Sequence, residues 1–440
     1  MTKIAVEKAV SASWIIPVVP ENRTLENCAV IINKGRIENI VPIKKLEEDY
    51  EVDSHLHLDG QVLMPGLINM HGHAAMSLFR GFADDLPLMT WLQDHIWPAE
   101  SRWVDEAFVK SGTELAIAEM LLSGTTCFSD MYFFPEVAAQ VAHTSGIRAQ
   151  IAFPIIDFPT NWSEGPDDCL SKGLALHDKY RSSDRISIAF GPHSPYAVND
   201  DALAKIVTYA EELQKPIQIH MHETAQEVQD SLAQHQKRPL KRMSELGLLS
   251  PLLQCVHMTQ IDDEDIELLI SSGAHIIHCP DSNLKLASGI SPVKKLLDNN
   301  INVALGTDGA ASNNDINMFE EMQHAALLAK AQSDDAAALD AHQAIRLATI
   351  NGAKAMGIDA ETGSLEIGKA ADMCAVDLNP LHMQPVYNPA SQIVYTGAAN
   401  EVTHVWVNGR HIVKDKQLDT LSPEHIVQSA RSWREKITNG

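Results

Sequence analysis

Apolar and polar residues follow two different patterns along the chain, and each pattern predicts a different kind of structure. Residues 1–62 alternate in short runs, with Asn33-Lys34-Gly35-Arg36 between two of them, as in a strand–turn–strand unit. Residues 363–440 repeat this style, and Asn408-Gly409 lies between two further runs, as in a β-hairpin. We therefore expect the two chain ends to form one small β-sandwich, with a helix at the C-terminus.

Residues 63–362 show the second pattern, in which short apolar runs alternate with helical stretches. The helical stretches include residues 105–122, 200–213 and 263–271. The apolar runs are candidate strands, at residues 66–71, 124–130, 148–156, 186–192, 216–221, 253–257, 274–279 and 301–307. Eight successive strand–helix units predict a (β/α)8 TIM barrel, and with it an α/β fold.

Histidines and carboxylates lie at the C-terminal ends of these candidate strands. His71 and His73 are two residues apart, so in an extended strand both side chains point to one side and could bind one metal ion. The alternative is a pair of core histidines bonded to the backbone. The position of the pair favours the metal site, because TIM barrels place their chemistry at these strand ends. The other residues so placed are Asp130, His193, His220, Glu223, His257, His278 and Asp308.

Several other histidines and acids receive structural interpretations. His55 and His57 lie in an alternating polar and apolar segment, typical of a half-exposed strand, so we expect them to be solvated. His222 alternates away from the side on which His220 lies, which favours a structural role. We expect His278 to be a packed side chain and Asp130 to stabilise a loop or a neighbouring ligand.

Charge and cysteine content narrow the functional classes. The net charge is −24 and no basic block is present, which argues against nucleic acid and anionic membranes as partners. The six cysteines are scattered without a C-x-x-C pair, which indicates reduced thiols in a cytoplasmic protein. No apolar run has the length of about 18 residues that a membrane span needs, and the first residues do not follow the pattern of a secretory signal.

Six segments, taken in order, carry a resemblance to a known family. They are residues 64–73 (MPGLINMHGH), 191–196 (GPHSPY), 220–224 (HMHET), 282–289 (SNLKLASG), 306–309 (GTDG) and 368–372 (GKAAD). With them the chain resembles the amidohydrolase superfamily over nearly its whole length. Within that superfamily it is similar to deaminases of 5′-methylthioadenosine and S-adenosylhomocysteine, and to related triazine hydrolases.

The resemblance implies one zinc ion per chain, held by His71, His73, His220 and Asp308, with Fe2+ as an alternative metal. Two-metal relatives use a bridging carboxylated lysine from the fourth strand. Residues 186–190 (ISIAF) contain no lysine, so we expect a mononuclear site. Neutral imidazoles and a carboxylate are good zinc ligands, and a bound zinc lowers the pKa of its water to about 7.

The resemblance also implies roles in catalysis. Asp308 would accept a proton from the water, and Glu223 would donate one to N1 of a purine. The alternative for Glu223 is a carboxylate stabilised by a helix N-terminus. His257 would orient the attacking oxygen and stabilise the charged intermediate, or else bond a ligand carboxylate. His193 would contact the substrate, although the prolines around it equally fit a rigid loop.

Residues 79–102 form a long, apolar connection after the first barrel strand. It could be a lid over an apolar part of the substrate or a helix packed on the barrel. We expect Trp91 to contact the substrate, and Leu86, Leu88 and Met89 to suit a methylthio group. Some relatives carry a ribose-binding acid two residues before this tryptophan. Met89 occupies that place here, which leaves ribose recognition unassigned.

The leading hypothesis is a homodimeric deaminase that converts the adenine ring of 5′-methylthioadenosine and/or S-adenosylhomocysteine to the inosine product and ammonia, and acts on adenosine more slowly. One alternative is an amino- or chlorohydrolase of s-triazines or other heterocycles. Another is a non-catalytic homologue that binds a purine or a metal. The complete set of candidate catalytic and metal-binding residues argues against the last of these.

Overall fold

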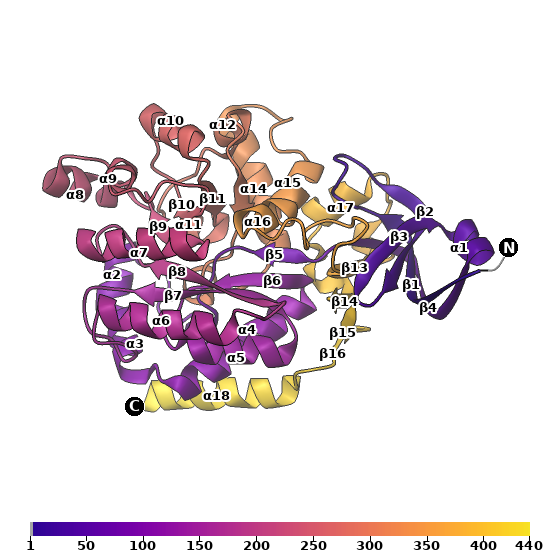
Figure 1. Ribbon diagram of the computed structural model, residues 1–440, viewed down its shortest axis with the longest axis horizontal. Coiled ribbons are helices and arrows are strands. Elements are labelled where there is room, and N and C mark those ends of the chain that lie inside the picture. The colour runs from indigo at the N-terminus through magenta and orange to yellow at the C-terminus, as the bar shows by residue number, and fades with distance from the viewer. Residues whose placement is uncertain (1–2) are drawn as a thin grey trace.

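A closed ring of parallel strands forms the larger part of the molecule in the computed structural model, which describes residues 3–440 (Figure 1). Consecutive strands are hydrogen-bonded neighbours, and most are buried along their whole length, as expected for a parallel sheet covered on both faces. They are β5 (Leu67–Asn69), β6 (Thr125–Asp130), β7 (Arg148–Ile155), β8 (Ile186–Pro192), β9 (Ile217–Met221), β10 (Leu253–His257), β11 (His275–His278) and β12 (Val303–Leu305). The predicted (β/α)8 barrel is confirmed.

The first and last barrel strands meet just beyond their regular hydrogen-bonded parts. The Met70 amide donates to the Leu305 carbonyl oxygen at 2.9 Å, and the Asp308 amide donates to the His71 carbonyl oxygen at 3.0 Å. Gly306 is required here, because a Cβ at this position would lie 2.7 Å from the His71 backbone nitrogen. Closure of the barrel therefore places two residues that are far apart in sequence, His71 and Asp308, side by side.

Helices cover the outside of the ring and begin where the sequence provides capping groups. Asp105, Asn199 and Asp262 each accept a backbone N–H of the first helical turn that follows, and they precede the three predicted helical stretches, which are confirmed. The elements of this layer are η1 (Ala74–Phe79), α2 (Leu88–Thr90), η2 (Trp91–Ile96), α3 (Trp97–Trp103), α4 (Glu106–Leu122), α5 (Pro135–Ser145), α6 (Pro166–Tyr180), α7 (Asp200–Leu213), α8 (Ala225–His235), α9 (Pro239–Glu245), α10 (Asp263–Ser272), α11 (Pro280–Lys285), α12 (Val293–Asp298), α13 (Ala310–Asn313), α14 (Met318–Ser333), α15 (Ala341–Leu347) and α16 (Ile350–Ala355).

Both chain ends contribute to a second, mixed sheet beside the barrel, as predicted (Figure 1). Its hydrogen-bonded order is β3-β2-β1-β4-β13-β14-β15-β16, and β4 and β13 join the two ends of the chain. The strands are β1 (Ile4–Ile15), β2 (Leu25–Asn33), β3 (Arg36–Pro42), β4 (Tyr50–Pro65), β13 (Met373–Asp377), β14 (Val402–Val407), β15 (Arg410–Lys414) and β16 (Gln417–Leu418). The short elements between these strands are α1 (Ile43–Asp49), η3 (Leu381–Met383), α17 (Pro389–Tyr395) and η4 (Ala398–Glu401).

Two predicted hairpin turns pack against each other and help to hold the chain ends together. Gly35 and Gly409 both have positive φ, at 78° and 70°. A Cβ on Gly409 would lie 2.5 Å from the Gly35 Cα, so the two turns approach as closely as glycine permits. Arg148 of β7 pairs with the buried Asp372, 3.0 Å away, and so ties the barrel to this sheet.

The predicted C-terminal helix is α18 (Pro423–Asn439), which runs along the outside of the barrel (Figure 1). Its Trp433 packs edge-on against Phe108 of α4, with ring centroids 5.2 Å apart. The chain end is thus fixed to the barrel rather than to the second sheet. Within residues 3–440, none of the helices has the length and apolar character needed to cross a membrane.

Candidate metal centre and active site

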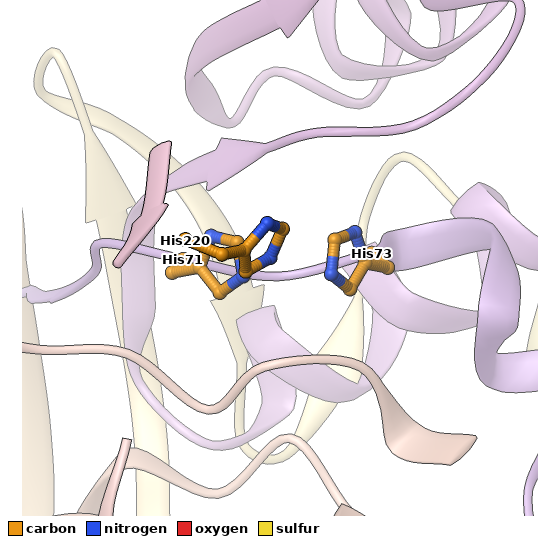
Figure 2. A group of neighbouring side chains, drawn as sticks. All are labelled: His71, His73 and His220. Atoms are coloured by element: carbon orange, nitrogen blue, oxygen red, sulfur yellow. The ribbon is translucent and has the colours of Figure 1, made fainter. Parts of the chain in front are cut away.

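Three histidines gather at the C-terminal end of the barrel (Figure 2). His71 and His73 follow β5, and His220 lies on β9. The Nε2 atoms of His71 and His220 are 3.1 Å apart, and the His71 ring centroid is 4.8 Å from those of both other rings. The two H-x-H residues of the first strand and the histidine of the fifth strand thus share one site, as the sequence predicted.

The other nitrogen of each ring is fixed by an acceptor. Nδ1 of His73 lies 2.6 Å from the Met131 carbonyl oxygen, and Nδ1 of His220 lies 2.6 Å from the His193 carbonyl oxygen. Nδ1 of His71 lies 2.9 Å from Oε1 of Gln218. A carbonyl oxygen can only accept, so each Nδ1 carries a proton and each Nε2 is the atom that faces the site.

The orientation of the Gln218 amide is itself determined by its surroundings. Its Nε2 donates to the Met70 carbonyl oxygen at 2.9 Å, which leaves Oε1 to accept from His71. Burial lowers the pKa of His71 to about 3, so this ring is neutral at physiological pH. Burial also lowers the pKa of His220 well below its usual value. Burial opposes protonation of His73 as well, but the hydrogen bond and the negative charge of Asp308 outweigh it and raise the pKa of His73 to about 9. The cluster thus favours a positive charge at its centre, which a proton on His73 or a bound metal ion can supply.

Asp308 completes the cluster from the last strand. Its Oδ1 lies 3.3 Å from Nε2 of His73 and 3.6 Å from Nε2 of His71. Ser282 donates a hydrogen bond of 2.7 Å to Oδ2, which holds the carboxylate in this orientation. The backbone of Asp308 is left-handed, with φ of 61°, which is a strained conformation of the kind that active sites often retain.

The donor set fits a metal of the zinc type. Three imidazole nitrogens and one carboxylate oxygen are ligands that zinc accepts, and each of the histidines is oriented by a further hydrogen bond, as is usual for metal-binding histidines. These four residues are the ligands that the family resemblance implied, and their binding of a metal stays a prediction.

Glu223 and His257 lie beside this cluster. Nε2 of His257 is 3.8 Å from Oε2 of Glu223, while its Nδ1 is 2.8 Å from Oδ1 of Asn283. Burial raises the pKa of the Glu223 carboxyl, which favours a form that carries a transferable proton. The structure therefore places Glu223 next to His257. The resemblance implied that Glu223 donates a proton and that His257 orients the attacking oxygen.

The helix that follows Glu223 does not use its carboxylate. Thr224 caps α8, and Glu227 accepts the backbone N–H groups of His222 and Glu223 at 2.9 and 2.7 Å. The alternative interpretation, in which Glu223 serves the helix N-terminus, is therefore not supported by these contacts. The Glu223 side chain instead faces the cavity described next.

A cavity of about 520 Å³ lies over the histidines and the two acids. His193 is part of its wall, and the centroid of its ring lies 4.7 Å from that of His220. Trp91 also lines the cavity and is only 6% exposed. Both predicted substrate contacts are thus placed where a substrate would bind.

The connection after β5 is helical and covers part of the cavity. Leu88, Trp91 and Trp97 line the cavity from α2, the π-helical turn η2 and α3. The expectation for Leu86 and Met89 was wrong. Neither lines the cavity, and Met89 is 40% exposed because it lies on the outer face of the turn that points Leu88 inward.

Residues with structural interpretations lie outside the cluster. His222 is buried and bonds the Gln260 carbonyl oxygen and the Leu240 amide. His278 is also buried, and the Asp130 carboxylate accepts the Ala74 amide at 2.7 Å, in the loop that carries His73. The exposed His55 and His57 both bond Ser11 of β1, far along the sheet from the barrel.

The residues that orient the metal-binding and catalytic side chains could not be assigned from the sequence. They include Gln218 on β9 and Ser282 and Asn283 on α11, each of which bonds a site residue of another βα unit. A signal was present, since Gln218 precedes His220 by two residues and therefore shares its side of the strand. Its partner His71, however, lies 147 residues away in the sequence.

Comparison with known proteins agrees with this geometry. The sequence model of the amidohydrolase family matches residues 62–412. A 5-methylthioadenosine/S-adenosylhomocysteine deaminase from Saccharophagus degradans is 58% identical over 435 residues, which cover 99% of this chain and 98% of that protein. The chain belongs to the amidohydrolase family.

Two solved structures superpose over almost the whole molecule. A zinc-bound adenosine deaminase from Xanthomonas campestris has a TM-score of 0.99 and 43% identity, with full coverage of both chains. A zinc complex of an atrazine chlorohydrolase from Arthrobacter aurescens has a TM-score of 0.91 over 97% of this chain and 99% of that one. At 22% identity, the second similarity concerns the fold alone.

We predict that Asp308→Ala loses both bound metal and activity, because it removes a carboxylate that lies within 4 Å of two of the three histidines. Elemental analysis should give one metal per chain in the unaltered protein and far less in the variant. His55→Ala is the matched control, since it removes a histidine of another H-x-H pair and should leave the metal content unchanged. Two metals per active chain, or full activity of Asp308→Ala, would contradict the prediction.

Proposed function

We propose that the protein deaminates the adenine ring of 5′-methylthioadenosine and/or S-adenosylhomocysteine by metal-dependent hydrolysis, and that of adenosine more slowly. The observation that carries the proposal is the convergence of three Nε2 atoms and the Asp308 carboxylate at the floor of a cavity, with the Glu223 carboxyl beside them. The name of the Saccharophagus relative supports the substrates, and that of the Xanthomonas relative supports adenine as the reacting ring.

The proposed ligands are His71, His73, His220 and Asp308, around one zinc ion per chain, with Fe2+ as the alternative. A zinc ion bound there would activate water as a nucleophile at neutral pH. Each of the three histidines directs its Nε2 at the site because its Nδ1 proton is held by an acceptor elsewhere. A metal ion bound there would displace the proton that Asp308 favours on His73.

The proton transfers are assigned to the two acids. Asp308 is placed to accept a proton as water attacks C6 of the purine, and Glu223 to donate one to N1 of the ring. Burial keeps the pKa of Glu223 raised, which suits a general acid. His257 is held by Asn283 with its Nε2 toward Glu223, and there it would orient the attacking oxygen and stabilise the charge that develops. Asp308 would then pass the proton it accepted to the exocyclic amine, so that ammonia leaves, and Glu223 would take the remaining hydroxyl proton as the C6 carbonyl forms.

His193 and Trp91 are the proposed substrate contacts. His193 lies next to His220 on the cavity wall, and Trp91 offers an aromatic surface from the helical cover. A purine can stack on such a surface while its polar edge faces the acids. The same wall would exclude water during the reaction.

We predict that Glu223→Gln keeps the metal but loses about 10²–10⁴-fold in turnover, because the amide preserves the shape of the side chain and removes its transferable proton. Steady-state ammonia release and elemental analysis on the same sample would measure both effects. Glu212→Gln, at an exposed position on α7, is a matched control. Turnover near that of the unaltered protein would exclude Glu223 as the general acid.

We predict that methylthioadenosine is deaminated several-fold to about tenfold more efficiently than adenosine, since one methyl-sized apolar group contributes only about 0.8 kcal/mol per carbon. Activity on AMP should be negligible, because the net charge of −24 repels a phosphorylated nucleotide. Kinetics with these three compounds and an s-triazine would decide between the proposed function and the triazine alternative. A triazine that reacts much faster than methylthioadenosine would exclude the nucleoside assignment.

We predict a homodimer, since two-fold assemblies are the commonest oligomers of soluble enzymes. Light scattering at the concentration used for kinetics should give twice the mass of one chain, and a monomer there would contradict the prediction.

A cytoplasmic location remains a prediction as well. The six cysteines, all unpaired and buried, are consistent with it.

A further inference from the structure

The cavity has a polar floor and an apolar rim. The floor consists of the buried metal-binding residues and acids, of which His220, Glu223 and Asp308 are each less than 9% exposed. At the opening, Phe158 and Tyr196 also line the cavity but are each 51% exposed. We use the term rim for these two residues together with the other apolar side chains near the surface that line the cavity, namely Leu88, Phe133 and Pro159.

The proposed reaction fixes which part of a nucleoside meets this rim. C6 of the purine must lie at the floor, near Glu223 and Asp308. The glycosidic nitrogen N9 is on the opposite side of the base from C6, so the ribose and its 5′ substituent point toward the opening. The 5′ substituent is therefore the part of the substrate that contacts the rim.

No lysine or arginine is among the described residues that line the cavity. Its titratable side chains other than histidine and tyrosine are the acids Glu100, Glu223 and Asp308. Glu100 accepts a hydrogen bond from the Tyr132 hydroxyl at 2.7 Å. Near the opening, the Asn161 amide is occupied, since it donates to three backbone carbonyl oxygens of residues 100–104.

Two basic residues adjoin the cavity in sequence, and both are engaged elsewhere. Arg102 follows the cavity residue Ser101, but it bonds the Gly440 carbonyl oxygen and lies over the Trp103 ring. Lys285 precedes the cavity residue Leu286, but it pairs with Asp84 at 2.7 Å. Neither side chain is directed at a ligand in the opening.

From this arrangement we infer that the site selects adenosines with a small uncharged 5′ substituent, such as methylthio or 5′-deoxy, and discriminates against the zwitterionic homocysteine tail of S-adenosylhomocysteine. The apolar rim gains from covering a methylthio group. The carboxylate of the homocysteine tail would instead lie against apolar side chains, with no lysine or arginine of the cavity lining to pair with it. This inference rests on the proposed function, because it uses the position of C6.

The test is steady-state ammonia release by the metal-loaded enzyme with methylthioadenosine, 5′-deoxyadenosine and S-adenosylhomocysteine. We expect kcat/KM to be about ten- to hundredfold lower for S-adenosylhomocysteine than for methylthioadenosine, as for an unpaired charge against an apolar wall. The 5′-deoxy compound should be close to methylthioadenosine. Equal or faster deamination of S-adenosylhomocysteine would overturn the inference, whereas no ammonia from any of the three would instead overturn the proposed function.

A variant of the rim provides an independent check. Phe158→Arg introduces a cation at an exposed position, and it should raise kcat/KM for S-adenosylhomocysteine while lowering it for methylthioadenosine. Phe158→Leu is the matched control, because it keeps the rim apolar and should preserve the order of the substrates. If Phe158→Arg left the ratio of the two values unchanged, the rim would not contact the 5′ substituent and the inference would fail.

Discussion

The active site depends on one electrostatic constraint, which is the convergence of three imidazole Nε2 atoms and the Asp308 carboxylate on a site that favours a cation. Each ring of His71, His73 and His220 is held there by a hydrogen bond from its other nitrogen to an oxygen that can only accept. The fixed tautomers and the carboxylate make the cluster favourable around a cation. The fold thus favours metal binding, because hydrogen bonds within the protein orient the ligands before the metal binds.

Closure of the barrel makes this constraint possible. The ring of strands brings the first strand against the last, and the hydrogen bond from the Asp308 amide to the His71 carbonyl oxygen fixes their relative register. A shift of one residue would turn His71 or Asp308 to the other face of its strand. Gly306 permits the approach, so a residue without a side chain at the seam is as necessary to the site as the ligands are.

The floor and the opening of the cavity differ in polarity. Its floor holds acids and imidazoles whose protonation states are controlled by burial, as the raised pKa of Glu223 illustrates. Its opening is apolar and is formed by loops and by the helical segment after β5. The residues proposed for catalysis thus lie at the rigid ends of the strands. The residues proposed for substrate selection lie on connecting segments, whose sequence can vary without disturbing the strand ends.

The sequence by itself determined the barrel and the joining of the two chain ends, and it placed the candidate metal-binding residues at one end of the barrel strands. Periodicity identified the strands and helices, and parallel strands place all of their C-terminal ends on one face, so residues such as His71 and Asp308 were predictably close. The alternation within H-x-H pairs also separated His220 from His222.

Only the tertiary structure decided how those residues are held and what surrounds them. Gln218 and Asn283 act through bonds to other strands, and such bonds depend on register and side-chain rotamer rather than on local pattern. Met89 lies outside and Leu88 inside because of the rotation of one helical turn, which apolar composition does not determine. The physical reason is the same in each case. Local patterns set the backbone conformation and the face of a strand or helix on which a side chain lies, whereas contacts between distant segments are set by the packing of the whole chain.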